Sequence, residues 1–317
     1  MRILTTIFAI FAMFAAFAFD AAEWQFRKEV LMREAERLQA VYTASVARVK
    51  MPAENVCVPV ETHPDGSVKT LVTASKAQFF TDNGIVWAKD LQAKDFDTSK
   101  KNKSSIFAEK CVVDRETKSG WIEGAGKAVH GSTEVTGERV YVSFAENFVM
   151  IYSNAFVRSD DVKKSTNKKG SSAKTKVEVR ADKADYDRTE GVVFMDGHVK
   201  FDDGEYSLVS DRAWVFLSGT NELRRVVASG SVAVTNGLKR GYCDKVLYER
   251  KAGNITMYGR SQKELAHLID EGPDGGELQG TRIFFRTDAE QVEVDNPIIT
   301  VKGDVKKADI FSEGRGK

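Results

Sequence analysis

One short phrase recurs along most of this 317-residue chain, and it constrains the fold more than any other feature. It runs ADKADYD at 181–187, SDRAWVF at 210–216 and CDKVLYE at 243–249. Each copy has an acidic residue or its substitute, a basic residue, an apolar residue, a variable position and a second apolar residue. A repeat of this length indicates small units that bury their apolar faces against one another. The basic residue of the phrase occurs at Lys76, Lys110, Arg139, Lys183, Arg212, Lys245 and Arg282.

The phrase alternates with a period of two. The position after the basic residue and the position two further on are apolar or aromatic in every copy, whereas the position between them accepts Gln and Asp. This alternation predicts a β-strand with one committed face and one permissive face. We therefore expect Asp185, at a permissive position, to be exposed.

A turn and a second strand follow each phrase, most clearly in 188–201, 226–237 and 251–259. Their glycines supply the backbone freedom that hairpins require. After residue 52 few segments have helical periodicity, so the body is predicted to be an antiparallel stack of short strands. Two geometries fit the pattern equally: a filled sandwich or β-helix, and a slab folded over along one side and open along the other.

One interval between phrases is longer than the rest because it contains SDDVKKSTNKKGSSAKTK, residues 159–176. This Lys- and Ser-rich stretch has no apolar pattern. It is predicted to be a flexible insertion in the repeating body, which favours a solvated loop over a basic contact to phosphates or a partner.

The first 22 residues have the features of a secretory signal peptide. Arg2 precedes an apolar run over 3–19, and Ala16 and Ala18 form a small-residue cleavage pattern, with Ala22 as a second point. The alternative is an uncleaved membrane anchor, since the run has nearly the length of a membrane span. Both place the rest of the chain outside the cytoplasm.

Residues 23–51 are predicted to form an amphipathic helix that ends before Pro52. A membrane-proximal spacer and a plug over one end of the domain are functional alternatives, but an apolar stripe favours a helix packed on the body. The stripe recurs at steps of three and four, at Leu31, Ala35, Leu38, Tyr42, Ser45 or Val46, and Val49.

Composition excludes several classes of function. Lys and Arg total 47 against 46 Asp and Glu, so the overall charge does not indicate a nucleic-acid partner. Cys57, Cys111 and Cys243 have no zinc spacing and no disulfide framework, although one disulfide stays an alternative. The four histidines are dispersed, and no phosphate-binding loop or Ser/His/Asp spacing occurs. We predict no enzyme activity, catalytic residue, metal or cofactor; a β-helix polysaccharide lyase is the formal alternative.

The phrase followed by a turn and G-x-V-x-[LM]-x-G-x-V resembles the OstA-like repeat of the LptA and LptC family of periplasmic lipopolysaccharide-transport proteins, also present in the N-terminal part of LptD. The stretch 181–237 carries the pattern most closely, and the resemblance continues to residue 304. Residues 70–158 match more weakly, since Ser75, Glu109 and Glu138 replace the aspartate.

The resemblance implies an all-β fold: a folded-over antiparallel β-slab, called a β-taco or β-jelly roll, over residues 52–305, with a flexible tail at 306–317. It also implies a trough that takes the acyl chains of lipopolysaccharide or a related glycolipid on the way to the outer membrane. Partners would be other β-slab proteins of the inner- and outer-membrane complexes, joined by edge-strand pairing, or further copies of the chain. The rival is a non-enzymatic periplasmic β-solenoid scaffold or filament.

The acidic–basic pair of the phrase, as in Asp182–Lys183, has two interpretations. One is cross-strand pairing with an Asx-type bond, which is favoured because surface pairs are common; the other is contact with lipid phosphates. The residues expected to line the trough belong to the committed strand faces: Phe79, Val142, Ala184, Tyr186, Tyr206, Leu208, Ala213, Val215, Val232, Val234, Val246, Tyr248, Ile255, Met257, Ile283 and Phe285.

Overall fold

The structure is a computed structural model that describes residues 21–163, 174–204, 206–218, 222–250, 252–273, 275–286 and 292–301. It divides into two compact units. Unit 1 contains the described residues 21–157 and 183–193, and unit 2 contains those of 158–182 and 194–301. The expected signal peptide and tail lie outside the described residues, apart from Ala21 and Ala22, which begin the first helix.

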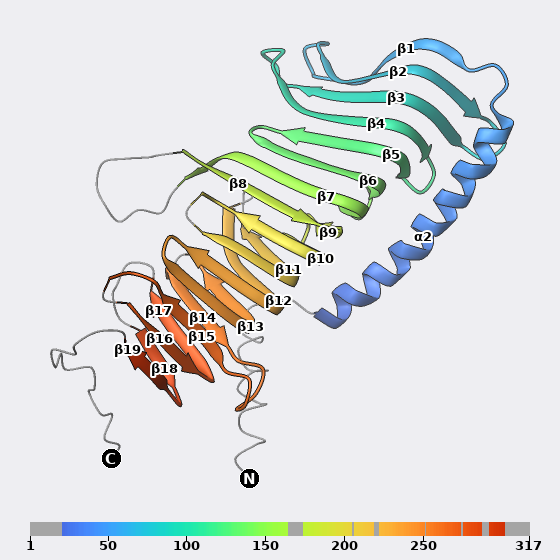
Figure 1. The fold of residues 1–317 in the computed structure, drawn as a ribbon. Coiled ribbons are helices and arrows are strands. Elements are labelled where there is room, and N and C mark those ends of the chain that lie inside the picture. Colours follow the sequence, from blue (N-terminus) through green and yellow to red (C-terminus); the bar gives the residue numbers. More distant parts are fainter. Residues whose placement is uncertain are drawn as a thin grey trace. The chain divides into compact units, whose positions relative to one another are not determined.

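Unit 1 is a ladder of long antiparallel strands with one helix (Figure 1). The helix is α2 (Ala21–Arg48), and it ends short of Pro52, which disfavours helix in the residues before it. The strands are β1 (Ala53–Thr62), β2 (Val68–Phe80), β3 (Ile85–Phe96), β4 (Asn102–Asp114), β5 (Ser119–His130), β6 (Thr133–Ser143) and β9 (Lys183–Asp187), with the first part of β7 (Phe148–Lys163).

Unit 2 continues the hairpin pattern with strands that shorten toward the C-terminus. They are β8 (Lys174–Ala181), β10 (Val192–Asp202), β11 (Ser207–Ser218), β12 (Glu222–Asn236), β13 (Lys239–Glu249), β14 (Asn254–Tyr258), β15 (Ala266–Asp270), β16 (Gly276–Gly280), β17 (Arg282–Arg286), β18 (Val292–Asp295) and β19 (Ile298–Val301).

The long strands are bent where the phrase begins. At this point the ladder register shifts, for example between Ala108 and Lys110 of β4 and between Val209 and Arg212 of β11. A shift of this kind changes which side chains face inward and increases the local bend. Strand β13 divides in the same way, since its Lys245–Glu249 part pairs with β14 and its Lys239–Tyr242 part pairs with β15.

Because of the bend, the two halves of a long strand turn the same face toward each other. In unit 2 Leu208 and Val232, which lie on one side of the bend, share a buried cluster with Val246 and Ile283 from the other side. The described body is therefore a folded-over antiparallel slab with a helix at its N-terminal end, which confirms the expected fold class.

Strands extend into both ends of the segment predicted to be an insertion. Residues 159–163 belong to β7 and residues 174–176 belong to β8. Strand propensity depends strongly on context, so Lys and Asp did not mark a strand end here although both are depleted in strands. Residues 164–173 lie outside the described part of the chain.

Candidate functional site

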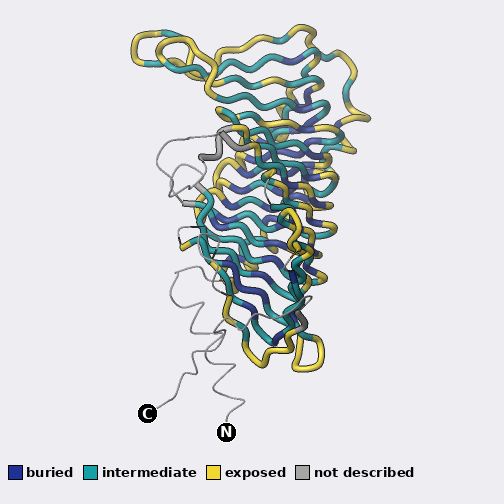
Figure 2. Tube along the Cα trace, turned by 60° about the vertical axis from the view of Figure 1, so that its left-hand side comes forward, coloured by how far each residue is buried: buried dark blue, intermediate teal, exposed yellow. Residues whose placement is uncertain are grey.

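The committed face of the phrase is the inner face of the slab, and its burial is graded. The first committed position, next to the bend, is buried at Cys111, Val140, Ala184, Ala213, Val246 and Ile283, and half-buried at Ala77. The third position, further from the bend, is half-buried at Val113, Val142, Tyr186, Val215, Tyr248 and Phe285, and exposed at Phe79. Figure 2 shows how buried, half-buried and exposed residues are distributed along the trace of the chain.

This gradient divides the inner face into a buried core beside the bend and a partly accessible apolar surface further from it. In unit 2 the positions beside the bend, such as Val246 and Ile283, pack with residues from the other strand halves and supply a core. The third positions keep part of their apolar surface accessible to solvent, and Phe79 is 47% exposed. Within each unit, apolar side chains that recur partly exposed from strand to strand form an extended apolar surface rather than a single pocket.

The sequence-predicted residues therefore fall into two groups. Eight are buried: Ala184, Leu208, Ala213, Val232, Val246, Ile255, Met257 and Ile283. Seven are half-buried, namely Val142, Tyr186, Tyr206, Val215, Val234, Tyr248 and Phe285, and Phe79 is exposed.

In unit 2 the structure brings most of these residues together. Val246 and Tyr248 of β13 are opposite Met257 and Ile255 of β14, and β14 in turn pairs with β17. The cluster also contains residues that the sequence reasoning missed: five of them lie on second strands outside the phrase, and Cys243 is the first residue of its phrase, a position that was not assigned to the committed face. These are Phe201, Ala228, Cys243, Ala266, Leu268 and Val294. Pairing each second strand with the phrase across its hairpin could have identified most of them, because directly opposed residues lie on the same face of the sheet.

The acidic residue of the phrase lies at the bend of the neighbouring strand. Asp182 Oδ2 is 2.8 Å from His198 Nδ1, and its carboxylate is next to Gly197. Asp211 has the same relation to Gly230 and accepts a hydrogen bond from Ser231 Oγ at 3.4 Å. The exposed Asp182 raises the pKa of His198 through this hydrogen bond. Both aspartates therefore contact residues at the bend of the neighbouring strand of the same chain.

Glu109 repeats this arrangement in unit 1, where its Oε2 accepts a hydrogen bond from the amide of Ala125 at 3.2 Å beside Gly124. The basic residues of the phrase contribute cross-strand ion pairs, as between Arg212 and Asp196 at 3.2 Å. Both observations support the structural interpretation of the acidic–basic pair.

The permissive face has a structural function in unit 1, since α2 packs on it. A row of directly opposed residues crosses the strands there: Gln78, Trp87, Val112, Trp121 and Tyr141. The last four are buried. From the helix, Trp24, Leu31, Ala35, Leu38 and Ser45 are buried, so the helical stripe packs on the body as its pattern indicated.

The expectation that Asp185 is exposed is wrong. Its exposed fraction is 8%, and Lys28 Nζ of α2 lies 2.5 Å from its Oδ2. Covering the permissive face with a helix turns an exposed strand position into a buried ion pair, which strand periodicity alone does not reveal.

Further ion pairs hold α2 on the strand ends. Arg37 Nη2 donates to Asp114 Oδ2 at 2.6 Å and to Glu34 Oε1 at 2.7 Å. The Arg37 hydrogen bond lowers the pKa of Glu34. Burial opposes the ionisation of Asp114, but the hydrogen bonds from Arg37 and from the backbone of Thr117 and Glu116 lower its pKa.

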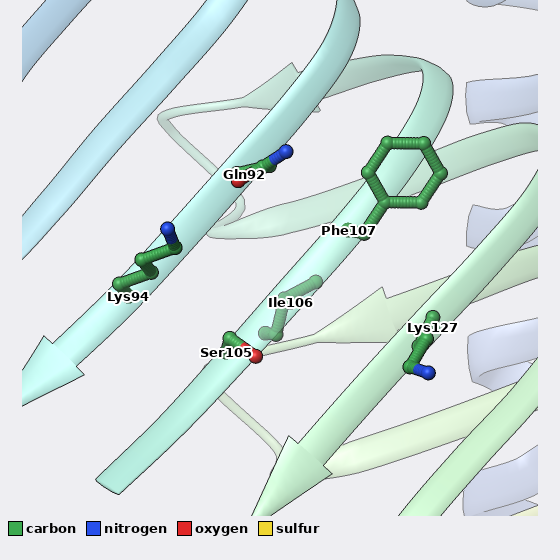
Figure 3. Close-up of a pocket in the computed structure, with 6 residues that line it drawn as sticks. All are labelled: Gln92, Lys94, Ser105, Ile106, Phe107 and Lys127. Carbon is green, nitrogen blue, oxygen red and sulfur yellow. The ribbon is translucent and has the colours of Figure 1, made fainter. Parts of the chain in front are cut away.

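A separate shallow hollow lies on the outer face of unit 1, with a volume of about 120 Å3. Figure 3 shows its lining: Gln92 and Lys94 of β3, Ser105, Ile106 and Phe107 of β4, and Lys127 of β5. Four of its six lining residues are polar, and none of the six is among the residues predicted to hold acyl chains.

The three cysteines are free, and burial raises the pKa of Cys111 and of Cys243 to about 12, so these two are weak nucleophiles. The described residues contain no group of three or more His, Cys, Asp or Glu side chains arranged to hold a metal. Within the same residues, no helix has both the length and the apolar character needed to cross a membrane.

Residues 178–291 match the family model described as the LptA and LptD N-terminal domain of lipopolysaccharide-transport proteins. Among solved structures, the chain is similar to LptH of Pseudomonas aeruginosa, described as the LptA-homologous periplasmic component of the lipopolysaccharide transport device. The two share 17% identity, and the match covers 41% of this chain and 95% of LptH with a TM-score of 0.35, which is too low to support an argument. No curated protein matches the chain.

Proposed function

Since residues 178–291 make this chain an OstA-like member of the lipopolysaccharide-transport family, we propose that it is a periplasmic lipid-binding protein of lipopolysaccharide or related glycolipid transport. Its slab, taken as residues 52–305, holds acyl chains against the inner face and joins partners edge to edge. The observation that carries the proposal is the burial gradient, with a buried row beside the bend and half-exposed apolar side chains beyond it.

The chemistry suits an acyl chain. Burying a methylene contributes about 0.8 kcal/mol, so even a partly ordered chain gains several kcal/mol along a row of apolar side chains. A row of Val, Tyr and Phe needs no single polar residue to bind hydrocarbon, which agrees with the lack of a catalytic signature in the sequence.

The ends of the slab suit pairing with another slab. Strand β1 pairs with β2 through one of its edges, and its residues are exposed along almost the whole strand. Pro59 lies within it, and proline inside a sheet is confined to edge strands and bulges. Unpaired edge groups are a template for another strand. Partners in this role are other β-slab proteins of the transport complexes or further copies of the chain.

The rival function is a filled β-solenoid scaffold, and one observation favours it. In unit 2 Met257 and Ile283 are almost completely buried, so the interior near the bend is already occupied by side chains. Lipid binding then requires the two halves of the slab to separate at the third positions, whereas a scaffold requires no such opening.

Photo-crosslinking separates the two functions. A photoreactive residue at Tyr248 lies on the inner face, and one at Leu247 lies on the outer face of the same strand. We expect capture of lipopolysaccharide or a related glycolipid in cells at Tyr248 and not at Leu247. Equal capture at both sites contradicts the face assignment. Absence of capture at Tyr248, Val215 and Phe285 alike removes the lipid-binding function and favours the scaffold.

A matched pair of substitutions provides the control. Tyr248→Asp places a carboxylate on the inner face, and Tyr242→Asp places the same group at a position of β13 that is 43% exposed. The first is expected to abolish lipid binding and the second to retain it. Thermal melting of both variants identifies a loss caused by unfolding instead.

A further inference from the structure

We infer that the outer hollow of unit 1 is a binding site for an anionic sugar, meaning a sugar ring that bears a phosphate or a carboxylate. This site lies on the opposite face of the strands from the proposed acyl-chain surface and does not depend on it. Its residues form two adjacent rows across three strands. Gln92, Phe107 and Lys127 are directly opposed to one another, and Lys94 is opposed to Ser105 in the next row.

The strand register places these side chains on the outer face. Ala108 is buried on the inner face, so Phe107, its neighbour in β4, points outward. Figure 3 shows the Phe107 ring on the β5 side of β4, while the side chains of Gln92 and Lys94 rise from β3 and that of Lys127 from β5. Phe107 is half-buried, so its ring offers part of one surface to solvent.

The charges in the hollow favour an anion. Lys127 Nζ is 2.8 Å from Glu134 Oε2, so this ammonium is held in place and partly neutralised. Lys94 has no acidic partner within ion-pair distance in the described part of the chain. Two ammonium groups against one carboxylate leave the site with a surplus positive charge, and an ammonium is a strong donor to a phosphate or carboxylate.

The remaining groups match a sugar ring better than a simple ion. A flat apolar ring beside an amide and a hydroxyl, at Phe107, Gln92 and Ser105, can cover the C–H face of a sugar and exchange hydrogen bonds with its hydroxyls. The volume of about 120 Å3 is far below that of a drug-sized pocket, which begins near roughly 300 Å3, so the hollow suits contact with a single ring.

The equivalent position in unit 2 differs from the hollow of unit 1 in its charges. Tyr242 occupies the place of Phe107 three residues before the phrase's basic residue, and it lies opposite His267 at a ring distance of 6.5 Å. His267 is 3.5 Å from Glu277, and no lysine of this row accompanies it. An aromatic side chain is therefore present on both outer faces, but the surplus of ammonium groups belongs to unit 1.

The test is titration of the full chain, followed by NMR, with glucose 6-phosphate, glucuronate and neutral glucose. We expect millimolar binding of the two anionic sugars, with shifts confined to β3, β4 and β5, and binding of glucose at least tenfold weaker. Lys94→Gln and Lys127→Gln are each expected to weaken the binding of glucose 6-phosphate several-fold. Lys89→Gln, an exposed lysine of β3 outside the hollow, is the control and is expected to bind as the wild type does.

Phe107→Ala should abolish the binding of all three sugars, and its melting temperature separates this effect from unfolding. Titration with the delipidated carbohydrate of lipopolysaccharide then distinguishes the source: shifts at the same residues assign a glycolipid headgroup, and shifts with the monosaccharides alone assign a free sugar. Glucose binding as tightly as glucose 6-phosphate overturns the proposal. So does unchanged affinity in both hollow lysine variants, or absence of shifts with a folded wild type.

Discussion

At the bends, single glycine and aspartate residues determine the local backbone conformation. Gly230 has a φ of 77° and Gly197 a φ of 80°, a region that residues with a side chain rarely adopt. A Cβ at either glycine would collide with the carboxylate of Asp211 or Asp182. The acidic residue of one strand and the glycine of the next therefore form the bend together.

Gly230→Ala is expected to destabilise the protein by about 2–4 kcal/mol, because it adds a steric clash to the strain of a left-handed residue. Gly204→Ala is the matched control, since Gly204 has a φ of 80° but open space around the position of a Cβ. It should cost only about 1–2 kcal/mol. Urea denaturation measures both, and equal losses would mean that Asp211 does not constrain the bend.

Among the elements, α2 covers the part of the outer face of unit 1 that is formed by the permissive positions of the phrase. It is 28 residues long, or about 42 Å, enough to cross the ladder obliquely and contact several hairpins. Arg48 pairs with Asp82 and Arg37 with Asp114, which lie at the ends of successive hairpins. Apolar contact fixes the helix against the strands, and these ion pairs align it along the row of turns.

Leu38→Ala should therefore reduce the stability of unit 1 by about 2–5 kcal/mol, because Leu38 is fully buried between α2 and the strands. Val46→Ala, on the exposed side of the same helix, should change it by less than about 0.5 kcal/mol. Denaturant unfolding followed by tryptophan fluorescence reports this directly, since Trp24 of α2 packs on Phe148. Similar losses for the two variants would contradict the packed stripe.

Acid is expected to loosen the same helix. The pKa of Asp114 and of Glu34 is lowered in the folded protein, so both carboxylates add stability above their ordinary values of 3.8 and 4.5. That stability is lost as the pH falls below these values and through the lower folded pKa. Near-ultraviolet circular dichroism between pH 7 and pH 2 should follow the release of α2.

Asp114→Asn is the control for this pH dependence. The variant retains the size of the side chain but loses a titrating group, so its acid transition should be flatter than that of the wild type. An unchanged transition would show that other carboxylates control the acid sensitivity.

For the whole molecule, the edge of β1 that does not pair with β2, and for which the described residues supply no other strand, is the feature with the largest expected consequence. A photoreactive residue at Val58 or Val60, both exposed on β1, should capture a partner slab or a second copy in cells. The same probe at exposed Lys263, outside the strands, is the control. Capture at Lys263 with none on β1 would refute edge pairing at this end.

Much of this architecture was predictable from the sequence, for a physical reason. Side chains alternate between faces with a period of two, so seven copies of one phrase identify the strands, their inner face and the antiparallel stack. The same periodicity placed Tyr248 and Val246 on the face that forms the buried cluster of unit 2. The stripe at Leu31, Ala35 and Leu38 likewise marked the side of the helix that is buried.

Other properties depended on tertiary contacts that no local pattern records. Asp185 was expected to be exposed and is buried, because a helix about 140–160 residues earlier in the chain covers its face. The grading of the inner face, buried at Val246 and half-buried at Tyr248, follows from the bend and from the approach of the opposite strand halves. Periodicity assigns a side chain to a face of its strand; only the fold decides what lies against that face.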